Sequence, residues 1–303
     1  MFGRLVATVA AFLFLPAAST SAPPEGGDTL PIWSEEILFP AECEDWDEWD
    51  KPTSPFRVFG NTYYVGTCGI TALLIESDDG LILIDGGTRA GADIVVRNIR
   101  WAGFAVEEVK LLLHSHEHFD HVGGLAALQR MSGARLLASP QAAPVLASGI
   151  AANDDPQAGM HEPFEAARVD GIIVPGEPVR LGNVELLPIA TPGHTPGALS
   201  WQWQTCEAES HCRTIVYADS LSPISSDDYR FSDHPAYVAD FRAGLARLAA
   251  LDCDILLTPH PSAGGMRDKL VADTLAIPPS CRDYAAAIER RLDERLAREA
   301  DDR

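Results

Sequence analysis

The chain has 303 residues, 46% of them hydrophobic, and a formal net charge of −21. It is long enough to bury a sizeable core, in one large domain or in two small ones. Its acidity excludes partners rather than selecting one, because such a surface repels phosphate backbones and anionic membranes. We therefore expect no nucleic-acid partner and no membrane partner.

Residues 1–22 have the features of a secretory signal peptide. Arg4 supplies the positive charge, residues 5–15 form an uncharged apolar run, and residues 17–22 offer small side chains for cleavage. Pro16 ends the apolar run, which disfavours a buried N-terminal helix. We expect an exported protein whose mature chain begins near residue 23.

In the first half of the mature chain, the composition and the pattern of apolar residues change at residue 56. Residues 23–55 are rich in Pro, Trp and acidic side chains without a clear period, and they predict an irregular arm. Short β-rich runs separated by Gly or Asp then predict a meander of strands at residues 57–67, 69–77 and 80–87. A helical pattern around residues 94–99, the apolar strand VKLLL and a helix that begins after Gly124 follow.

The second half repeats this alternation. Strands are predicted at residues 184–190, 198–204, 213–219 and 254–258. A helix is predicted over residues 235–250, and an amphipathic C-terminal helix is indicated by apolar residues at spacing four, namely Tyr284, Ile288, Leu292 and Leu296. Two β-rich halves with helices indicate an α+β fold of two packed sheets flanked by helices, rather than one parallel sheet.

The cysteines indicate disulfide bridges. The chain contains six, all after the predicted cleavage site: Cys43, Cys68, Cys206, Cys212, Cys253 and Cys281. An even number in an exported chain predicts bridges, although sequence alone permits about 15 connectivities for six cysteines. No two of them form a CxxC pair, which disfavours structural zinc fingers and thioredoxin-like redox chemistry.

The segment HSHEHFDH, residues 114–121, indicates a metal centre. It places His116, His118, Asp120 and His121 directly after the predicted strand VKLLL. Imidazole and carboxylate are ligands that Zn²⁺ prefers, and four such groups within six residues cannot reach one ion without severe strain. Two zinc ions are therefore expected.

Two isolated histidines complete the ligand sets. His194 lies in the tight turn ATPGHTPG, and His260 lies at the predicted strand end LLTPHPS. We expect His116, His118 and His194 to hold one zinc and Asp120, His121 and His260 to hold the other. Three protein ligands per ion leave a position for water, which is typical of a catalytic site.

Other histidines and serines receive plainer interpretations. A lone histidine is more often a core or surface residue than a ligand, which is our interpretation of His161, His211 and His234. His114 lies outside the HxHxDH ligand pattern, and we expect it either to support the ligands by hydrogen bonding or to pack in the interior. Ser77 and Ser139 lack the sequence context of a nucleophile.

The HxHxDH segment, the later GH turn and the PH at a strand end together resemble the metallo-β-lactamase superfamily. From about residue 49 to the C-terminus, the chain resembles the members of subclass B3 in particular. The segments that carry this resemblance are GNTYYVGTCGITALLI, SHEHFDHVGGL, TPGHTPGALSW, VYADSLSPIS and CDILLTPHPS. The resemblance implies one αββα domain over residues 56–303, with two mixed β-sheets flanked by helices and both zincs at one edge of the sheets. It also implies a periplasmic enzyme that hydrolyses β-lactam antibiotics, and we expect a monomer that acts on this small-molecule substrate.

The resemblance implies roles for single residues. Ser220 stands where other subclasses place a cysteine ligand, so it does not ligate zinc and instead helps Ser222 to hold the substrate carboxylate. Asp85 orients a ligand imidazole. His114 departs from the family pattern, in which a small polar residue or Asn is expected. The implied disulfides are Cys43–Cys68, Cys206–Cys212 and Cys253–Cys281.

The expected mechanism uses no covalent intermediate. A zinc-bound water has a pKa lowered toward neutrality, so a hydroxide shared by the two ions would attack the lactam carbonyl. Asp120, as ligand and hydrogen-bond acceptor, would orient this hydroxide.

Two alternatives remain open at this point. The first is a hydrolase of the same fold that acts on thioesters, lactones or phosphodiesters, in which an acidic residue such as Asp219 bridges the metals. The second is a non-catalytic periplasmic zinc-binding protein. Export, the cysteine pattern and the pair Ser220 and Ser222 favour the β-lactamase.

Residues 150–170 show few regular patterns and could form the lip of the site, although an ordinary mobile loop has the same features. Gln157, Met160 and Phe164 are the candidates for substrate contact.

Overall fold

The structure, a computed structural model, describes residues 36–208, 210–277 and 280–301, together with Gly3. Contacts divide the chain into the units Met1–Pro31 and Ile32–Arg303, and all helices and strands named below belong to the second. Apart from Gly3, the predicted signal peptide (residues 1–22) lies outside the described residues. Residues 23–35 of the predicted arm lie outside them as well.

The first β-sheet has seven strands in chain order. β1 to β4 pair antiparallel, whereas β4 to β7 pair parallel, so the sheet is mixed. The strands are β1 (Phe56–Phe59), β2 (Thr62–Tyr64), β3 (Leu73–Ser77), β4 (Gly80–Ile84), β5 (Val109–Leu113), β6 (Arg135–Ala138) and β7 (Val169–Ile172).

The second sheet has five strands in the order β12-β11-β10-β9-β8. β8 to β11 pair antiparallel and β12 joins β11 in parallel, so this sheet is mixed as well. The strands are β8 (Val179–Leu181), β9 (Val184–Ala190), β10 (Leu199–Ala208), β11 (His211–Tyr217) and β12 (Ile255–Leu257).

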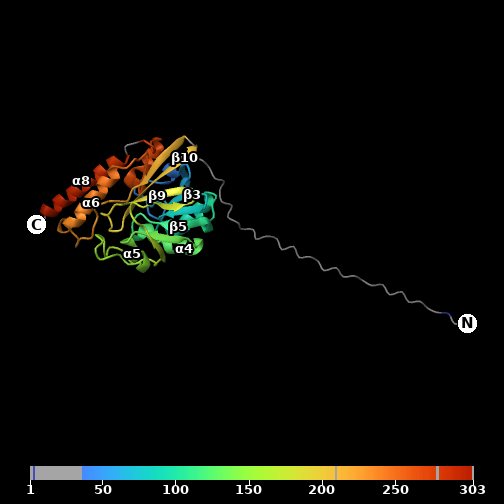
Figure 1. Cartoon of the computed structure of the whole chain (residues 1–303), viewed down its shortest axis with the longest axis horizontal. Coiled ribbons are helices and arrows are strands. Elements are labelled where there is room, and N and C mark those ends of the chain that lie inside the picture. The colour runs from blue at the N-terminus through green and yellow to red at the C-terminus, as the bar shows by residue number, and fades with distance from the viewer. Residues whose placement is uncertain (1–2, 4–35, 209, 278–279, 302–303) are drawn as a thin grey trace. The chain divides into compact units, whose positions relative to one another are not determined.

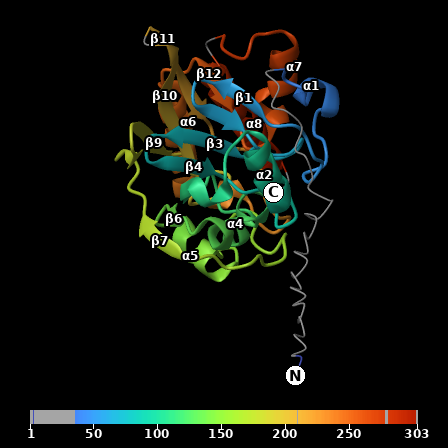
Figure 2. The ribbon, with the colours of Figure 1, turned by 90° about the vertical axis from the view of Figure 1, so that its right-hand side faces the viewer.

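Helices cover the outer faces of both sheets, and the strands lie between them (Figure 1). α2 (Gly91–Trp101), α4 (Leu125–Ser132) and α5 (Ala142–Ser148) pack on the first sheet, and α6 (Pro235–Ala249) and α8 (Ser280–Asp301) pack on the second. Figure 2 shows the same arrangement from the side. Shorter helices are α1 (Phe39–Glu42), α3 (Phe119–Val122), α7 (Met266–Val271) and the 3₁₀ turns η1 (Val106–Glu108), η2 (Phe231–Asp233) and η3 (Pro261–Gly264).

Strand alternation explains why both faces of each sheet are apolar. In β3, Leu73 and Ile75 point into the core between the sheets, whereas Leu74 points into the core beneath α2 and α4. In the second sheet, Tyr217 faces the inter-sheet core and Val216 packs with α6 and α8. Because side chains alternate along a strand, a sheet covered on both faces needs apolar residues at nearly every position.

The expected fold class is confirmed: two mixed sheets flanked by helices form one αββα domain. The sequence patterns did not single out the short strands β6, β7 and β8 or the helix α5. The predicted arm contains one helical turn, α1, where an irregular chain was expected. Residues 149–168 contain no helix or strand, in line with the absence of regular patterns there.

Disulfides join Cys43 to Cys68, Cys206 to Cys212 and Cys253 to Cys281, the three pairs that the resemblance implies. The first ties the arm to the segment after β2, the second closes the β10–β11 hairpin, and the third links the segment before β12 to α8. Among the described residues, no helix is both long enough and apolar enough to cross a membrane.

Candidate metal centre

A cluster of imidazoles and carboxylates lies just beyond the ends of three strands. β5 ends at Leu113, and the segment that carries His116 and His118 follows it. His194 follows β9 and His260 follows β12. The turn of His194 depends on Gly193, whose φ is +155° and where an added Cβ would lie 2.4 Å from the ring of Phe241.

Three histidines form the first ligand set. Ligand atoms of His116, His118 and His194 all lie within 4.8 Å of one another, and the three side chains are buried. This is the set expected for one zinc, and three imidazoles with an open fourth position are a common catalytic zinc site.

The second set gathers around Asp120. Its Oδ2 atom lies 3.1 Å from His121 Nε2 and 3.4 Å from His260 Nε2. Ligand atoms of Asp120, His121 and His116 also lie within 4.8 Å of one another, so the two sets are contiguous. The structure therefore brings together all six residues expected to bind zinc.

Hydrogen bonds on the far side of each ring leave a lone pair for a metal. His116 Nδ1 donates to Asp219 Oδ1 at 2.8 Å, and His118 Nε2 donates to Asp155 Oδ2 at 3.1 Å. His194 Nδ1 and His260 Nδ1 lie 3.0 Å and 3.2 Å from the backbone carbonyl oxygens of Ser222 and Gly69, which can only accept. Each of these hydrogen bonds fixes the tautomer of its ring, so that in the neutral imidazole the other nitrogen carries the lone pair that metal ligation requires.

Unpartnered buried atoms support the same conclusion. His116 Nε2 is buried without a hydrogen-bond partner among the described residues. The two ring nitrogens of His121 have only carboxylate oxygens near them, Asp120 Oδ2 at 3.1 Å and Asp85 Oδ2 at 3.6 Å, without hydrogen-bond geometry. A buried polar atom without a partner costs about 1–3 kcal/mol, so such atoms require an explanation. Convergent imidazole nitrogens beside a carboxylate match the donor set of zinc, and the residues present fit two such ions.

Burial and mutual charge set the protonation of the site. Burial and the neighbouring imidazoles lower the pKa of His116 and of His194, and they lower the pKa of His260 to about 4. Burial alone would raise the pKa of Asp120, but His121 and His260 outweigh it and hold that pKa well below its ordinary range. His116, His194 and His260 are therefore neutral imidazoles beside an ionised carboxylate. Burial lowers the pKa of His118 and His121 as well, but Asp155 outweighs it at His118, and Asp120 and Asp85 outweigh it at His121, whose pKa rises to about 10.

Asp219 does not point into either ligand set. One of its oxygens accepts from His116 Nδ1, and the other accepts from the backbone N–H of Leu221 at 3.1 Å. Burial raises the pKa of Asp219 to about 7. Asp85, which the resemblance assigned to orienting a ligand, lies 3.6 Å from His121 Nδ1 and accepts from Ser115 and Tyr217.

A cavity of about 290 Å³ opens onto the ligands. Ser220 and Ser222 line it, as do Trp46, Trp49 and Arg291. Ser220 Oγ is buried without a partner among the described residues, whereas Ser222 Oγ lies 3.1 Å from His194 Nδ1. The two serines expected to bind substrate are thus both at the site, in different environments.

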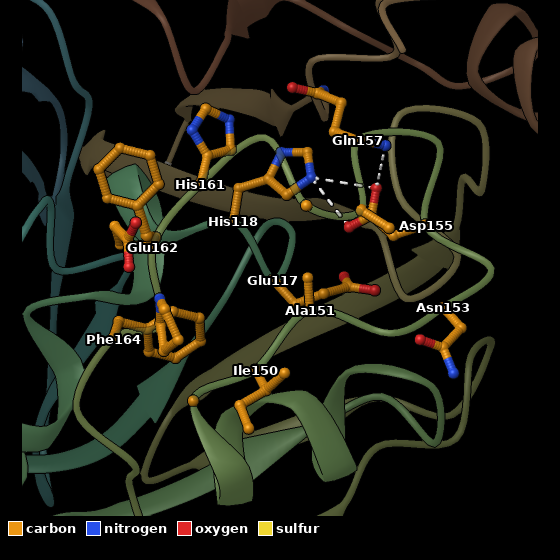
Figure 3. Close-up of a pocket in the computed structure, with 15 residues that line it drawn as sticks. Glu117, His118, Ile150, Ala151, Asn153, Asp155, Gln157, His161, Glu162 and Phe164 are labelled. Carbon is orange, nitrogen blue, oxygen red and sulfur yellow. Dashed lines mark hydrogen bonds and ion pairs between the residues drawn. The ribbon is translucent and has the colours of Figure 1, made fainter. Parts of the chain in front are cut away.

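A second cavity, of about 220 Å³, lies beneath residues 149–164 (Figure 3). Gln157 and His161 line both cavities, Phe164 lines only this one, and Met160 is 46% exposed and lines neither. His161, interpreted from sequence as an ordinary surface or core residue, therefore belongs to the surroundings of the site. Its ring centroid lies 6.1 Å from that of His118.

The other uncertain histidines lie away from the ligands or support them. His114 is buried; its Nε2 accepts from the N–H of Ser139 at 3.1 Å, and burial lowers its pKa to about 4, so it supports the fold beside the ligands. His211 pairs with Glu207 on the β10–β11 hairpin, and His234 stacks on Tyr229.

Sequence reasoning missed several residues of the site. Asp155 and Glu117 are buried acids, and Glu117 accepts from Thr195 and Gly197, which ties the HxHxDH segment to the turn of His194. Trp46, Trp49 and Arg291 line the metal cavity from the arm and from α8. The one available signal was Glu117, an acidic residue inside the HxHxDH segment that was not assigned to a ligand set.

Comparisons with known proteins point to one family. The profile of the metallo-β-lactamase superfamily matches residues 65–207. The solved MIM-2 metallo-β-lactamase is 58% identical, with a TM-score of 0.83 over 86% of this chain and 97% of that one. MIM-1 from Novosphingobium pentaromativorans is 45% identical, with a TM-score of 0.84 over the same shares. MEM-A1, a subclass B3 metallo-β-lactamase from a soil metagenome library, is 42% identical, with a TM-score of 0.80 over 84% and 100%.

More distant similarity is found to hydroxyacylglutathione hydrolases. Those of Acidiphilium cryptum (strain JF-5) and Anaeromyxobacter dehalogenans (strain 2CP-C) are 27% and 30% identical over 168 and 138 residues. The matches cover 55% and 45% of this chain and 55% and 43% of those proteins, so the chain spans about half the length of these curated relatives.

Proposed function

Because this chain belongs to the metallo-β-lactamase superfamily and is similar to its subclass B3 members, we propose that it is an exported enzyme with two zinc ions that opens the ring of β-lactam antibiotics. The observation that carries the proposal is the pair of contiguous ligand sets facing a cavity lined by Ser220 and Ser222. We place the enzyme in the periplasm, on the strength of the signal-like residues 1–22.

Zinc, when bound, supplies a Lewis acid for the carbonyl and lowers the pKa of a coordinated water toward 7. The chain's own residues do the positioning. Asp120, buried and ionised, accepts a hydrogen bond from the attacking water and so orients it. Ser220 Oγ has a free proton to donate to the substrate carboxylate, since no described residue accepts it.

A covalent serine intermediate is disfavoured by the tautomer of His194. Its Nδ1 donates to the carbonyl of Ser222, so this nitrogen cannot also accept the proton of Ser222 Oγ at 3.1 Å. The attacking oxygen therefore comes from water.

The competing function is hydrolysis of a thioester such as an acylglutathione, which the names of the distant relatives suggest. In that hydrolase a carboxylate near residue 219 would bridge the metals. Both oxygens of Asp219 are engaged elsewhere, which supports the β-lactamase.

The deciding experiment is to incubate the purified mature protein with a chromogenic cephalosporin and, separately, with lactoylglutathione. We expect hydrolysis of the cephalosporin, its loss on chelation, its recovery with Zn²⁺, and two zinc ions per chain by metal analysis. Turnover of the thioester alone would establish the competing function, and zinc binding without turnover of either would leave a binding protein.

A further inference from the structure

One cation faces the cavity of the metal centre. Of the described residues that line this cavity, Arg291 is the only Lys or Arg. It lies on α8, far along the chain from the ligand motif, and its side chain is exposed. Within the described part of the chain, neither an ion pair nor a hydrogen bond engages its guanidinium.

Arg291 shares its lack of a partner with the exposed Arg290 and Arg298 of the same helix, among the described residues, and differs from them in lining the cavity. Arg295 pairs with Glu299 and donates to Ser225 Oγ, and Arg242 of α6 pairs with Glu289 and Asp293. The chain has 44 acidic residues against 23 Lys and Arg, so acidic partners are abundant. A free guanidinium at the cavity is thus available to a ligand.

The helix holds this arginine close to the segment of the two serines. Tyr284, buried on α8, donates its hydroxyl to the carbonyl of Ser220 at 2.9 Å. Arg291 follows Tyr284 by seven residues, which is two helical turns and therefore the same side of α8. The cavity consequently combines a guanidinium with the unpartnered hydroxyl of Ser220.

The net charge of the chain, −21, opposes the approach of an anionic substrate from solvent, and a cation at the cavity offsets that repulsion locally. A guanidinium offers a planar fork of donors that matches a carboxylate in bidentate geometry.

We propose that Arg291 is a specificity-determining residue that binds the carboxylate of the β-lactam substrate beside Ser220. The inference rests on the proposed function, since it names the residue that recognises the anionic group of that substrate. The amide that is cleaved lies at the metal ligands, so Arg291 acts on binding and not on the bond-breaking step.

The test compares a penicillin with its neutral methyl ester on the zinc-loaded enzyme. Arg291→Gln is expected to raise KM for the penicillin by roughly 3- to 30-fold, the range of an exposed hydrogen bond to a charged group, while kcat stays within about twofold. KM for the ester is expected to stay the same. Arg291→Lys keeps the charge but loses the planar fork of donors, so its KM for the penicillin is expected to lie between the values of wild type and Arg291→Gln.

Arg290→Gln is the matched control, because Arg290 is the neighbouring exposed arginine of α8 and does not line the cavity. It is expected to behave as wild type. An equal rise in KM for penicillin and ester in Arg291→Gln, or the same rise in Arg290→Gln, would overturn the assignment.

A binding measurement separates this inference from the proposed function. Mercaptopropanoyl-proline and its methyl ester both present a thiol to the metals, and only the first carries a carboxylate. Titration calorimetry is expected to show tighter binding of the acid by wild type and loss of that preference in Arg291→Gln. If wild type hydrolyses no β-lactam, the proposed function fails, and this preference still decides whether Arg291 binds carboxylates. An unchanged preference in the variant would refute the role.

Discussion

Four of the candidate ligand histidines owe their orientation to a hydrogen bond on the side of the ring that faces away from the ligand cluster. The acceptors differ: carboxylates of Asp219 and Asp155 hold two of the rings, and backbone carbonyls of Ser222 and Gly69 hold the others. A carboxylate raises the basicity of the ring more than a carbonyl does and must itself be kept ionised. Burial opposes that ionisation at Asp219, whose pKa is raised to about 7.

Replacement of Asp219 distinguishes an orienting carboxylate from a bridging ligand. Asp219→Asn retains an acceptor for His116 Nδ1–H, so we expect both zinc ions to remain. Asp219→Ala removes the acceptor and is expected to weaken zinc binding by about 10- to 100-fold, as loss of such partners usually does. Competition with a chelator of known affinity measures this. Loss of zinc from Asp219→Asn would instead identify a ligand.

Mutation of the two serines of the cavity is expected to have different effects on KM and on zinc affinity. Ser220 Oγ has no partner among the described residues, so Ser220→Ala should mainly raise KM for anionic lactams, by about 10-fold or more, because a hydrogen bond to a charged group contributes about 1.5–3 kcal/mol. Ser222 Oγ also contacts His194, so Ser222→Ala should raise KM and alter zinc affinity as well. Steady-state kinetics with metal analysis test both. Identical phenotypes would contradict the distinction.

The structural elements divide the work of holding the site. The strand ends of β5, β9 and β12 carry the histidines, and the sheets cannot move them independently because Trp201 of β10 donates to the carbonyl of His114 at 2.9 Å. α8 supports the opposite wall, through Tyr284 to the segment of Ser220 and through Glu299 to η2. The wall formed by α8 is thus built from hydrogen bonds between the helix and a loop without regular structure.

Glu299 is the anchor at the end of α8. It is 4% exposed and accepts hydrogen bonds from the backbone N–H groups of Phe231 and Ser232. Burial raises the pKa of its carboxyl, but the hydrogen bonds from Ser232 and Arg295 outweigh burial, so the net pKa lies below its ordinary value. Its stabilisation is therefore complete above about pH 4.3, the unfolded pKa, and is lost as the pH falls through the lower folded pKa.

We expect Glu299→Gln to lower the free energy of unfolding by about 1–3 kcal/mol at pH 7. The difference from wild type should shrink below about pH 4, because wild-type Glu299 then becomes protonated. Urea unfolding at pH 7, 5 and 3.5 measures it, and comparison at each pH cancels the titration of the metal ligands. Glu294→Gln, at an exposed position of the same helix, is the control. A difference that does not change with pH would contradict the assignment.

Across the whole molecule, the disulfides differ in what they hold: one fixes the arm outside the sheets, whereas another joins two strands that are already paired. The Cys43–Cys68 bridge spans 25 residues and fixes the arm, whose Trp46 and Trp49 line the metal cavity. The Cys206–Cys212 bridge spans 6 residues of one hairpin. Because a bridge that closes a longer loop removes more entropy from the unfolded chain, the first is expected to contribute more stability.

We expect the folded protein to contain no free thiol, and titration of the unfolded, unreduced chain tests this. Replacing Cys43 and Cys68 by Ser should lower stability by about 3.5 kcal/mol and also raise KM, since the tryptophans lose their anchor. The same change at Cys206 and Cys212 should lower it by about 2 kcal/mol and leave KM unchanged. Denaturant unfolding and kinetics of the two double variants test this. Equal effects of the two double variants on KM would contradict a role of the arm in substrate binding.

Residue patterns alone predict the class of fold and the six candidate ligands. Periodicity predicts long elements such as β9, α6 and α8, because their apolar residues recur on one face. The HxHxDH segment indicates a metal site because it places several ligand-type residues together at the end of one strand. Short strands such as β6, with few residues to form a pattern, were missed. Which other side chains surround the ligands depends on the packing of distant segments. Asp155, Trp46 and Arg291 are unremarkable in sequence. Trp46 of the arm and Arg291 of α8 line the metal cavity, and Asp155 accepts from the ligand His118 beside it. Contacts between segments so far apart depend on how the two sheets pack, and no local pattern of residues encodes that geometry.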